Sequence, residues 1–375
     1  MSFQEVELGS VCRVVPGFAF KSKDLGNEGI QVLKIGNISD DRSVDMSFAQ
    51  RFPDSLIEDR HKKFFVRDKN IVIAMTGATA GKVGRLRTEE QVLLNQRVAK
   101  IEPKRINPDF LWIALSSPKY RNMFFHLAGG AAQPNMSGKQ IEKVTVPLPN
   151  TLIQSQIAEI LSTYDDLIEN NRRRITLLEK AARELYKEWF VRLRFPGHEH
   201  VAIVNGVPEG WEKRQIKEIL TLNYGKALKA DDRIKGEFPV YGSSGIIGYH
   251  NKALVKGPGI IVGRKGNVGK IHWSYLDYHP IDTVYYVDSK DSSFFIYQTL
   301  FNTYFLNTDV AVPGLNRDFA YSREIIVPTE PFRESFQAEA VPVYRQVNLL
   351  QTHNTKLAQA RDLLLPKLMS GEVAV

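Results

Sequence analysis

A single cysteine, Cys12, is present among the 375 residues of the chain. One cysteine can form neither an internal disulfide nor a cysteine-based zinc site, and such sparse use of cysteine fits a reducing cytoplasm. No apolar run approaches the ~20 residues that a membrane-spanning helix needs, and the first residues lack the pattern of a signal peptide. We therefore expect a cytoplasmic protein that does not associate with a membrane.

Glycine and proline are absent between Pro149 and Pro196, although both are frequent on either side. Within this stretch apolar residues recur three or four positions apart and charges cover the other face, which predicts a long amphipathic helix. A second stretch without glycine or proline runs from Val343 to Leu365, and Pro342 interrupts the pattern just before it. We expect a second long helix there.

Basic residues are in moderate excess. The 50 lysines and arginines outnumber the 42 acidic residues and give a formal net charge of +8. Such a charge favours a polyanion as partner, but only modestly, because many basic proteins bind no nucleic acid.

The sequence contains two copies of one pattern. The segment 81–85 (GKVGR) is similar to 266–270 (GNVGK), and Val146-Pro147 recurs as Val327-Pro328. A period of about 180 residues is longer than any solenoid repeat, so the repeated unit is a whole domain with a connecting element.

Short apolar runs bounded by turn residues predict strands in both copies. The chain is therefore predicted to be α/β (α+β), with two similar mixed α/β globular domains joined by a long antiparallel two-helix coiled coil in a pseudo-two-fold arrangement. The alternative, two unrelated helices that each pack on their own domain, is less favoured because the helices belong to the repeat. The expected strands are 31–35, 71–74, 92–94, 259–262 and 283–287, and the expected shorter helices are 109–127 and about 292–306. The expected domains are 1–150, 151–195 (spacer helix), 196–330 and 331–375 (C-terminal helix).

Several motifs come close to catalytic or nucleotide-binding signatures but depart from them at essential positions. The segment 77–83 resembles a phosphate-binding loop, yet it has one residue too few between its glycines and Val83 where serine or threonine would bind magnesium. The segment 107–110 (NPDF) resembles the catalytic loop of DNA adenine methyltransferases, but Asp109 replaces a proline and no glycine-rich fingerprint accompanies it. A proline and an acid that open a helix explain this segment better.

Nuclease chemistry finds no better support. The segment 102–104 (EPK) offers an acid and a lysine, but its central proline does not belong inside a strand. The eight histidines have no paired metal-ligand spacing. We therefore predict a non-catalytic chain that holds no cofactor and no metal.

Polar and basic residues in turns and at strand ends suit contact with DNA, because arginine, lysine, asparagine and glutamine read bases and lysine, serine and threonine bind phosphates. Singly, each could equally be a solvated loop residue. The candidates in the first copy are Lys21, Lys34, Asn37, Thr76, Thr79, Lys82, Gln96, Arg97, Gln133 and Asn135. The candidates in the second copy are Lys226, Tyr241, Ser243, Ser244, Arg264, Lys265, Asn267, Asn316 and Arg317.

The order of these motifs resembles the specificity subunit of type I restriction-modification systems, over essentially the whole chain. The segments of the first copy that carry the resemblance are 17–22 (GFAFKS), 35–38 (IGNI), 76–84, 94–97 (LNQR) and 133–135 (QPN), ahead of 146–149 (VPLP). Those of the second, divergent copy are 241–245 (YGSSG), 248–249, 263–266 (GRKG) and 280–283 (PIDT).

The resemblance implies a DNA-recognition subunit of a methyltransferase and endonuclease complex in a bacterial or archaeal cytoplasm. Each recognition domain would read one half of a bipartite site in double-stranded DNA, while the helices fix the gap and bind two methyltransferase subunits. S-adenosylmethionine, ATP and Mg²⁺ would then belong to those subunits and to separate restriction subunits. Two other readings stay open: a stand-alone DNA methyltransferase or nuclease, and a scaffold that binds only proteins.

Overall fold

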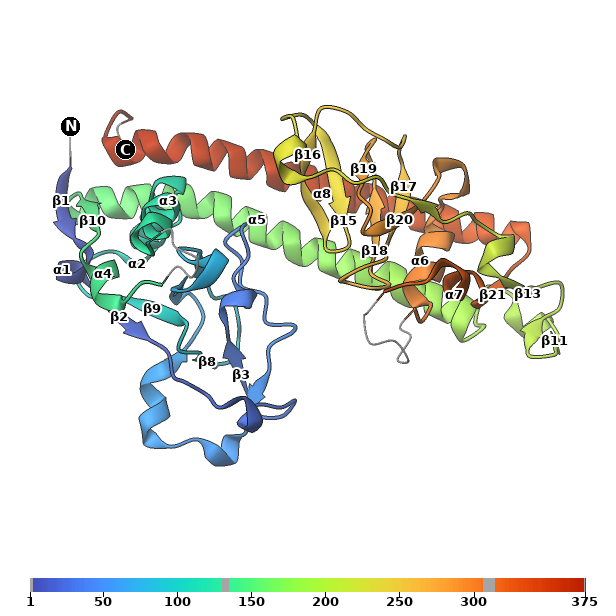
Figure 1. The fold of residues 1–375 in the computed structure, drawn as a ribbon, viewed down its shortest axis with the longest axis horizontal. Helices are drawn as coiled ribbons and strands as arrows, with labels where there is room; N and C mark the ends of the chain where they lie inside the picture. Colours follow the sequence, from blue (N-terminus) through green and yellow to red (C-terminus); the bar gives the residue numbers. More distant parts are fainter. Residues whose placement is uncertain (1–2, 130–134, 306–313, 374) are drawn as a thin grey trace. The chain divides into compact units, whose positions relative to one another are not determined.

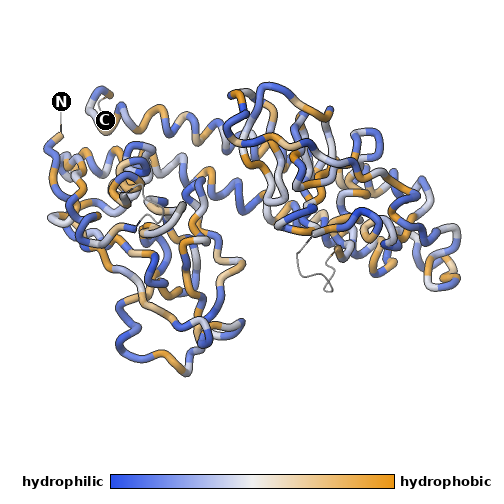
Figure 2. Tube along the Cα trace, in the orientation of Figure 1, coloured by the Kyte–Doolittle hydropathy of each residue, from blue (hydrophilic) through white to orange (hydrophobic). Residues whose placement is uncertain are grey.

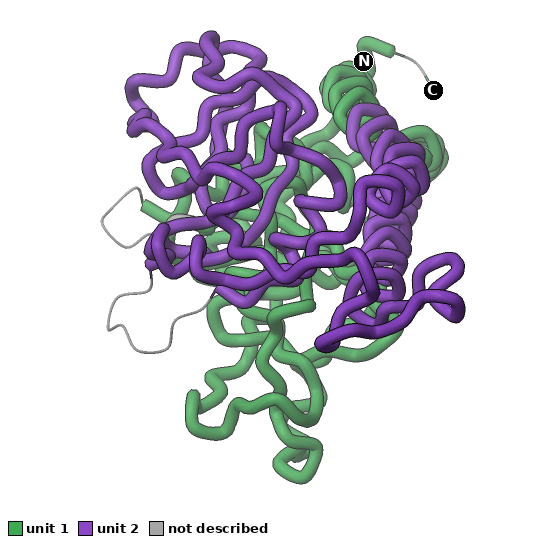
Figure 3. The backbone as a smooth tube through the Cα atoms, turned by 90° about the vertical axis from the view of Figure 1, so that its right-hand side faces the viewer, with its two compact units in different colours: residues 1–169, 354–375 green, residues 170–353 purple. Residues whose placement is uncertain are grey.

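The chain folds into two compact units (Figure 3). Unit 1 consists of Met1–Glu169 and Asn354–Val375, and unit 2 consists of Asn170–His353. The boundaries between them fall inside two long helices, which Figure 1 labels α5 and α8. Each unit therefore contains a globular part and a portion of each helix. The residues that this computed structural model describes are 3–129, 135–305, 314–373 and 375.

The globular part of unit 1 is a mixed α/β structure. Its strands are β1 (Gln4–Glu7), β2 (Cys12–Pro16), β3 (Ile30–Leu33), β4 (Arg51–Phe52), β5 (Phe65–Val66), β6 (Ile71–Ala74), β7 (Val83–Arg85), β8 (Val92–Leu94), β9 (Val98–Pro103) and β10 (Thr145–Leu148). Its short helices are α1 (Leu8–Val11), α2 (Pro108–Leu115), α3 (Pro118–Leu127) and α4 (Gly138–Glu142). One sheet has the order β2-β9-β6-β7, a second has the order β4-β3-β8-β5, and β1 pairs with β10. Strands β6, β7 and β8 are buried throughout, so the core of the unit forms around them.

Unit 2 repeats this architecture. Its strands are β11 (Ile203–Val204), β12 (Val207–Pro208), β13 (Glu212–Gln215), β14 (Asn223–Tyr224), β15 (Phe238–Gly242), β16 (Gly245–His250), β17 (Gly259–Gly263), β18 (Ile271–Ser274), β19 (His279–Pro280), β20 (Val284–Val287) and β21 (Glu324–Val327). Its short helices are α6 (Phe294–Asn302) and α7 (Arg317–Tyr321). The sheet β14-β20-β17-β18 has the same strand order as β2-β9-β6-β7, and β13 pairs with β21 as β1 does with β10. The predicted mixed α/β fold is thus confirmed.

Backbone hydrogen bonds define which residues of the two units are equivalent. The N–H of Ala74 donates to the carbonyl of Lys82 (2.9 Å), and the N–H of Gly263 donates to that of Lys270 (2.8 Å). In the same way Gly81 N–H donates to Ala74 (2.8 Å), and Gly269 N–H donates to Gly263 (2.9 Å). The structure therefore aligns Lys82 with Lys270.

This alignment corrects the register inferred from the sequence, which matched 81–85 with 266–270. The turn that follows Ala74 is one residue longer than the turn that follows Gly263, and glycines with positive φ occur near both ends of each turn. Matching glycine to glycine therefore slips the alignment, whereas the strand pairing on either side fixes it.

The long helices α5 (Thr151–Tyr186) and α8 (Glu330–Ser370) alternate hydrophobic and hydrophilic positions along their length (Figure 2). In unit 1, Ile157 and Leu161 of α5 share a buried cluster with Leu365 of α8. One to two turns further along α5, Asp165 pairs with Arg361 at 2.5 Å. Numbers rise along one helix as they fall along the other, so the two portions pack antiparallel within this unit.

In unit 2 the two helix portions meet through aromatic side chains. Phe336 of α8 is fully buried, and its ring centroid lies 5.9 Å from that of Tyr186 in α5. It lies 5.3 Å from that of Phe190, in the π-helical turn Lys187–Val191 that continues α5. Aromatic rings supply the largest buried areas of any side chains, so this cluster dominates the packing of α8 in the unit.

A glutamine joins a long helix to the globular part in both units. In unit 1 the N–H of Asn107, which caps α2, donates to Oε1 of Gln154 on α5 at 2.8 Å. In unit 2 the N–H of Phe294, the first residue of α6, donates to Oε1 of Gln337 on α8 at 3.0 Å. Each glutamine thus satisfies a backbone donor that the start of a helix leaves unpaired.

Two helix predictions were wrong in their bounds. The expected helix 109–127 is divided into α2 and α3 because Pro118 has no N–H to continue the ladder from the preceding turn. Conversely, α8 continues through Pro342, where the sequence predicted an interruption. Neighbours of this proline such as Ala340 and Tyr344 are buried, and their packing offsets the lost hydrogen bond, which costs about 3 kcal/mol in an exposed helix.

Of the helices within the described ranges, none is long and apolar enough to cross a membrane. The division of the chain at residues 150, 195 and 330 stays a prediction.

The aromatic cluster of unit 2 gives a stability prediction. Replacing Phe336 with alanine should lower the free energy of unfolding of unit 2 by about 3–5 kcal/mol, because a large side chain leaves a cavity at a fully buried position. The measurement is urea unfolding followed by tryptophan fluorescence, since Trp189 and Trp211 belong to the same cluster. Leu349→Ala is the matched control: Leu349 lies on α8 with 53% exposure and should change stability by less than about 0.5 kcal/mol. Equal effects of the two substitutions would contradict the packing described.

Candidate nucleic-acid interface

In unit 1, the loops that carry the predicted DNA contacts leave the sheets at one edge. Strands β3 and β8 are parallel, with Leu33 opposite Leu94, so their carboxyl ends lie side by side. Lys34 follows the first strand and Asn95 follows the second, and Asn95 N–H donates to the Leu33 carbonyl at 3.0 Å. Parallel pairing therefore brings together two segments that are far apart in the sequence.

The end of β6 reaches the same edge. Met75 N–H donates to the carbonyl of Arg97 at 2.9 Å, which places the turn after β6 beside the residues that follow β8. Thr76 forms an antiparallel bridge with Asn135. We call Lys34, Thr76, Gln96, Arg97 and Asn135 the unit 1 edge. The predicted residue Gln133 lies outside the described residues.

The side chains of the unit 1 edge differ in how freely they can meet a ligand. Gln96, Arg97 and Asn135 are exposed, while Lys34 is half-buried and its Nζ donates to Gln50 Oε1 at 2.5 Å. Three exposed groups of the kinds that read bases or bind phosphates thus lie on one edge.

Asn37 has a structural role. Its Oδ1 accepts from the N–H of Lys34 at 2.8 Å, its Nδ2 donates to the carbonyl of Asp45 at 2.8 Å, and its residue is 9% exposed. The amide closes a turn at both ends and is occupied within the fold. Thr79 likewise donates its hydroxyl to the Thr76 carbonyl at 3.2 Å, and Lys21 is exposed on a separate turn.

Lys82 forms an ion pair with the exposed carboxylate of Asp40. Its Nζ lies 2.8 Å from Asp40, and Arg121 approaches the same carboxylate at 3.7 Å. These residues line a cavity of about 190 Å³ together with Arg42, which pairs with Asp362 at 3.0 Å. Burial lowers the pKa of both arginines below their ordinary value. Sequence reasoning missed Arg42 and Arg121, because only the fold brings them close to Lys82.

Unit 2 builds an equivalent edge with the same backbone bonds. Arg264 N–H donates to the Thr283 carbonyl at 2.9 Å, as Met75 does to Arg97. Lys265 bridges Gly314, as Thr76 bridges Asn135. Residues that the sequence placed in separate loops are thus neighbours. We call Lys226, Ser243, Arg264, Lys265, Asn267, Asn316 and Arg317 the unit 2 edge.

Glycine is required directly after β2 and β14, the first strands of the main sheets β2-β9-β6-β7 and β14-β20-β17-β18. A Cβ on Gly17 would lie 2.3 Å from the carbonyl oxygen of Asn95, and one on Gly225 would lie 2.1 Å from that of Ile281. Both distances are far below van der Waals contact, so no larger residue fits without moving the backbone. In both units, then, two backbone segments lie in direct contact at the edge.

The members of the unit 2 edge are held by further local contacts. Ser243 Oγ accepts from the N–H of Asn267 at 3.4 Å, and its carbonyl lies 3.2 Å from His272 Nε2. Burial lowers the pKa of the His272 imidazole, which therefore stays neutral at pH 7. Asn316 caps α7 by accepting from Asp318 N–H at 2.7 Å. Lys226, Lys265 and Asn267 are exposed, as is Ser244 nearby.

Tyr241 lies in the core of unit 2 and not on its surface. Its residue is 6% exposed, its hydroxyl donates to the Trp273 carbonyl at 3.4 Å, and burial raises the pKa of the phenol. Tyr224, which sequence reasoning missed, is instead 47% exposed. The guanidinium carbons of Arg264 and Arg317 lie 5.0 Å and 4.9 Å from its ring centroid. An aromatic residue two positions before Lys226 was the available signal.

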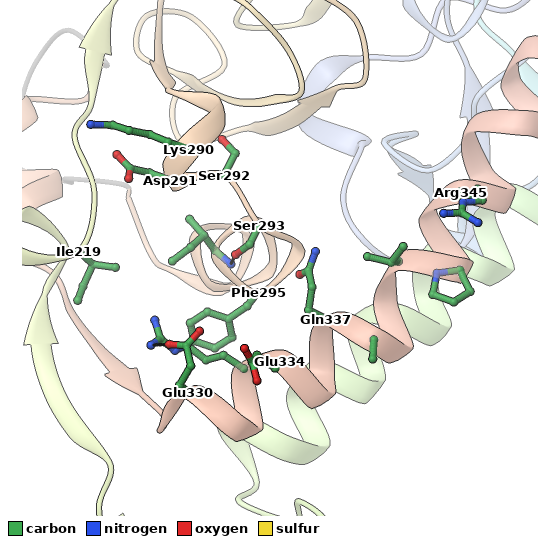
Figure 4. A pocket seen from close by; sticks show the side chains of 15 residues that line it. Ile219, Lys290, Asp291, Ser292, Ser293, Phe295, Glu330, Glu334, Gln337 and Arg345 are labelled. Carbon is green, nitrogen blue, oxygen red and sulfur yellow. Dashed lines mark hydrogen bonds and ion pairs between the residues drawn. The ribbon is translucent and has the colours of Figure 1, made fainter.

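A cavity of unit 2 is separate from this edge. It has a volume of about 720 Å³ and lies between α8 and the segment that leads into α6 (Figure 4). Gln337 uses its Oε1 within the fold, and Arg333 pairs with Glu330. None of the predicted contact residues lines it. Within the ranges that the structure covers, no group of three histidine, cysteine or acidic side chains could hold a metal ion.

The contacts of Asn107 and Asp109 show the role of the segment 107–110, which resembles a methyltransferase loop. Asn107 Oδ1 accepts from the N–H groups of Asp109 and Phe110 at 2.9 and 3.0 Å, and Asp109 pairs with Arg85. The segment is a helix cap, in agreement with the interpretation favoured from the sequence.

Comparison with known proteins agrees with this architecture. The family model described as the type I restriction modification DNA specificity domain matches residues 2–180 and 208–316. The type I restriction enzyme MjaIX specificity subunit of Methanocaldococcus jannaschii is 25% identical over 317 residues, which cover 75% of this chain and 73% of the relative. The HindI specificity subunit of Haemophilus influenzae is 21% identical over 376 residues, which cover 76% and 82%.

A solved structure shares the fold. The S subunit of a type I restriction-modification system from M. genitalium superposes with a TM-score of 0.52 at 18% identity, over 98% of this chain and 96% of that one. The fold of the chain therefore has a counterpart in a solved structure, and the family model covers most of the sequence. The chain belongs to the type I restriction-modification DNA specificity family.

Proposed function

We propose that the chain selects the DNA sequence for a type I restriction-modification complex, and that the unit 1 edge and the unit 2 edge each read one half of a bipartite site. The observation that carries the proposal is the duplication of the edge. The same backbone bonds hold Met75 to Arg97 in one unit and Arg264 to Thr283 in the other. The scaffold is repeated while the side chains differ, as expected of two readers with different targets.

The chemistry of the edges supports DNA as the ligand. Arg97 of unit 1 and Lys226 and Lys265 of unit 2 are exposed and cationic, and the exposed amides are Gln96 and Asn135 in unit 1 and Asn267 in unit 2. Cationic groups neutralise phosphates and amides read base edges, so each edge has groups for positioning and groups for specificity.

We further propose that α5 and α8 bind two methyltransferase subunits. Large apolar side chains remain exposed along α5, including Leu152 at 67%, Ile160 at 39% and Leu167 at 45%. They recur seven or eight positions apart and so fall on one side of the helix. Such a row fits a protein partner better than it fits water.

In this proposal the partner subunits catalyse methylation and cleavage. S-adenosylmethionine would bind to the methyltransferase subunits, and ATP and Mg²⁺ would serve restriction subunits that move along and cut DNA. This chain would contribute recognition, the gap between half-sites and the binding surface for its partners.

The proposal predicts that half-sites can be exchanged one at a time. Replacing residues 1–150 with the equivalent part of a relative should change one half-site and leave the other intact, because the described members of the unit 1 edge all lie within that segment. Methylation-sensitive sequencing of host DNA gives the sites for the parent and the chimaera. The reciprocal exchange of 196–330 is the matched control. A chimaera in which both half-sites changed would contradict independent reading.

The row on α5 predicts a loss of assembly. Ile160→Glu together with Leu167→Glu should weaken binding of the methyltransferase subunit at least tenfold, because a partner would have to bury two charges. Size-exclusion chromatography with the partner subunit measures this. Phe48→Glu is the control, since Phe48 is 83% exposed but lies on a loop of unit 1. An unchanged complex in the double variant would exclude this row as the binding surface.

The helices should also set the gap between half-sites. Four residues inserted after Asn170, with four matching residues inserted after His353, lengthen both helices by about 6 Å at 1.5 Å per residue. Because base pairs rise about 3.4 Å each, the gap should widen by one to two base pairs. The insertion sites lie at the boundaries between the two units within α5 and α8. Near them, Asn354 Nδ2 donates to the Ile168 carbonyl at 3.3 Å.

Mapping methylated sites reads out this change. Four residues turn a helix by about 400°, which nearly preserves its apolar face, whereas two residues turn it by about 200° and should abolish assembly. Methylation at the original spacing by the four-residue variant would show that the helices do not determine the gap.

A further inference from the structure

One tyrosine ring of the unit 2 edge contacts two arginines. The guanidinium carbon of Arg264 lies 5.0 Å from the ring centroid of Tyr224 and 5.7 Å from that of Tyr285. The guanidinium of Arg317 lies 4.9 Å from the Tyr224 centroid. The negative face of an aromatic ring attracts cations, so the Tyr224 ring holds both arginines beside it. We call Tyr224, Arg264 and Arg317 the arginine–tyrosine cluster.

The cluster lies where the edge is assembled. Tyr224 ends β14, Arg264 follows β17, and Arg317 is the first residue of α7. Leu315 N–H donates to the Arg264 carbonyl at 2.8 Å, which joins the last two of these segments. Three chain segments thus converge on one half-exposed ring.

The guanidinium groups keep unused hydrogen-bonding capacity. Arg264 Nη1 donates to the Asp282 carbonyl at 3.1 Å, and Arg317 Nε is buried with no partner. Among the residues that the structure describes, neither guanidinium forms an ion pair with a carboxylate. Two neighbouring cations without a counter-charge favour an electron-rich acceptor as ligand.

Unit 1 shows that the fold does not require the cluster. The backbone bonds that align the units place Pro16, Met75 and Gly138 at the positions of Tyr224, Arg264 and Arg317. A Cβ on Gly138 would lie 3.6 Å from Cγ of Pro16, so the equivalent positions also adjoin in unit 1. Unit 1 fills these positions with uncharged residues.

The equivalence is independently supported by a bond to the first strand of each sheet. In unit 1, Glu142 Oε1 accepts from the N–H of Val14 at 3.0 Å. In unit 2, the hydroxyl oxygen of Tyr321 accepts from the N–H of Leu222 at 2.9 Å. Different side chains at matching positions of α4 and α7 thus perform one structural task. The arginines, by contrast, have no counterpart in unit 1.

We propose that Arg264 and Arg317, positioned by Tyr224, recognise a guanine in the half-site read by unit 2. Guanine presents O6 and N7 side by side in the major groove, and this pair matches two N–H donors on the edge of a guanidinium. Attraction to a ring uses no hydrogen-bond acceptor, so N–H donors of the guanidinium remain available. The inference rests on the proposed function and adds a base and its readers to it.

The experiment uses the full chain assembled with its methyltransferase subunit. The ligand is duplex DNA that carries the site that this complex methylates. Each guanine of the unit 2 half-site is replaced in turn by 7-deazaguanine, which lacks the N7 acceptor, or by inosine, which keeps both N7 and O6. At one guanine, 7-deazaguanine should weaken binding about 5- to 150-fold, the usual discrimination of a bidentate contact. Inosine at that position should bind as guanine does.

Variants connect this effect to the cluster. Arg264→Lys or Arg317→Lys keeps the charge but loses the fork of donors, so at least one should bind guanine and 7-deazaguanine equally. Tyr224→Phe should retain the discrimination, since the ring remains, and Tyr224→Leu should lose most of it. Lys256→Ala, an exposed residue of unit 2 outside the edge, should leave the ratio unchanged. The unit 1 half-site serves as an internal control, because its recognition should not change in any variant.

Several outcomes would overturn the inference: a unit 2 half-site without guanine, no effect of 7-deazaguanine at any position, or full discrimination in both lysine variants. Uniform loss of affinity over all sequences with a shallower salt dependence would show phosphate contact and overturn it also. In each of these cases the parent complex still selects its site, so the proposed function stands. A parent complex that selects no site would instead refute the proposed function itself.

Discussion

Main-chain hydrogen bonds at the carboxyl ends of strands are the constraint on which both edges depend. In each unit a parallel strand pair brings two chain segments to one edge, and the turn after the central strand bonds to the segment that precedes its antiparallel neighbour. Because these bonds use no side-chain atoms, the side chains at the edge can change without loss of the scaffold. Glycines such as Gly17 and Gly225 are different, because close contact with the backbone leaves no room for a side chain. The same frame can therefore present different chemistry.

The sequence predicted the strongly patterned elements and failed where tertiary contacts decide. Strands β6, β8 and β17 lie where apolar runs placed them, because each is buried throughout and has no polar face to obscure the pattern. The repeat was recognised, but its register was displaced, since glycines at both ends of a turn match each other in more than one way. Proline disfavours the interior of a helix, so the sequence predicted a break at Pro342. The helix α8 nevertheless continues through it, because its neighbours pack in the core of unit 2.

The interface was predicted as a set of loops more successfully than as a set of side chains. Residue type and loop position identified segments that the fold brings together, such as those of Thr76, Arg97 and Asn135. The same criteria could not distinguish Asn37 and Tyr241, whose polar atoms serve the fold, from exposed residues. Tyr224 was missed because a tyrosine alone carries no charge signal, and its importance comes from two arginines that are distant in sequence.

The glutamines Gln154 and Gln337 have a mechanical consequence. Each ties a long helix to the start of a shorter helix through a hydrogen bond from a backbone N–H. Further contacts join the same pairs of helices: Trp112 Nε1 of α2 donates to Asp165 of α5 at 2.8 Å, and the ring centroids of Phe294 and Tyr344 lie 4.1 Å apart. Since α2 and α6 also pack against strands of their own units, a shift of α5 or α8 would have to move the short helix and the sheet together.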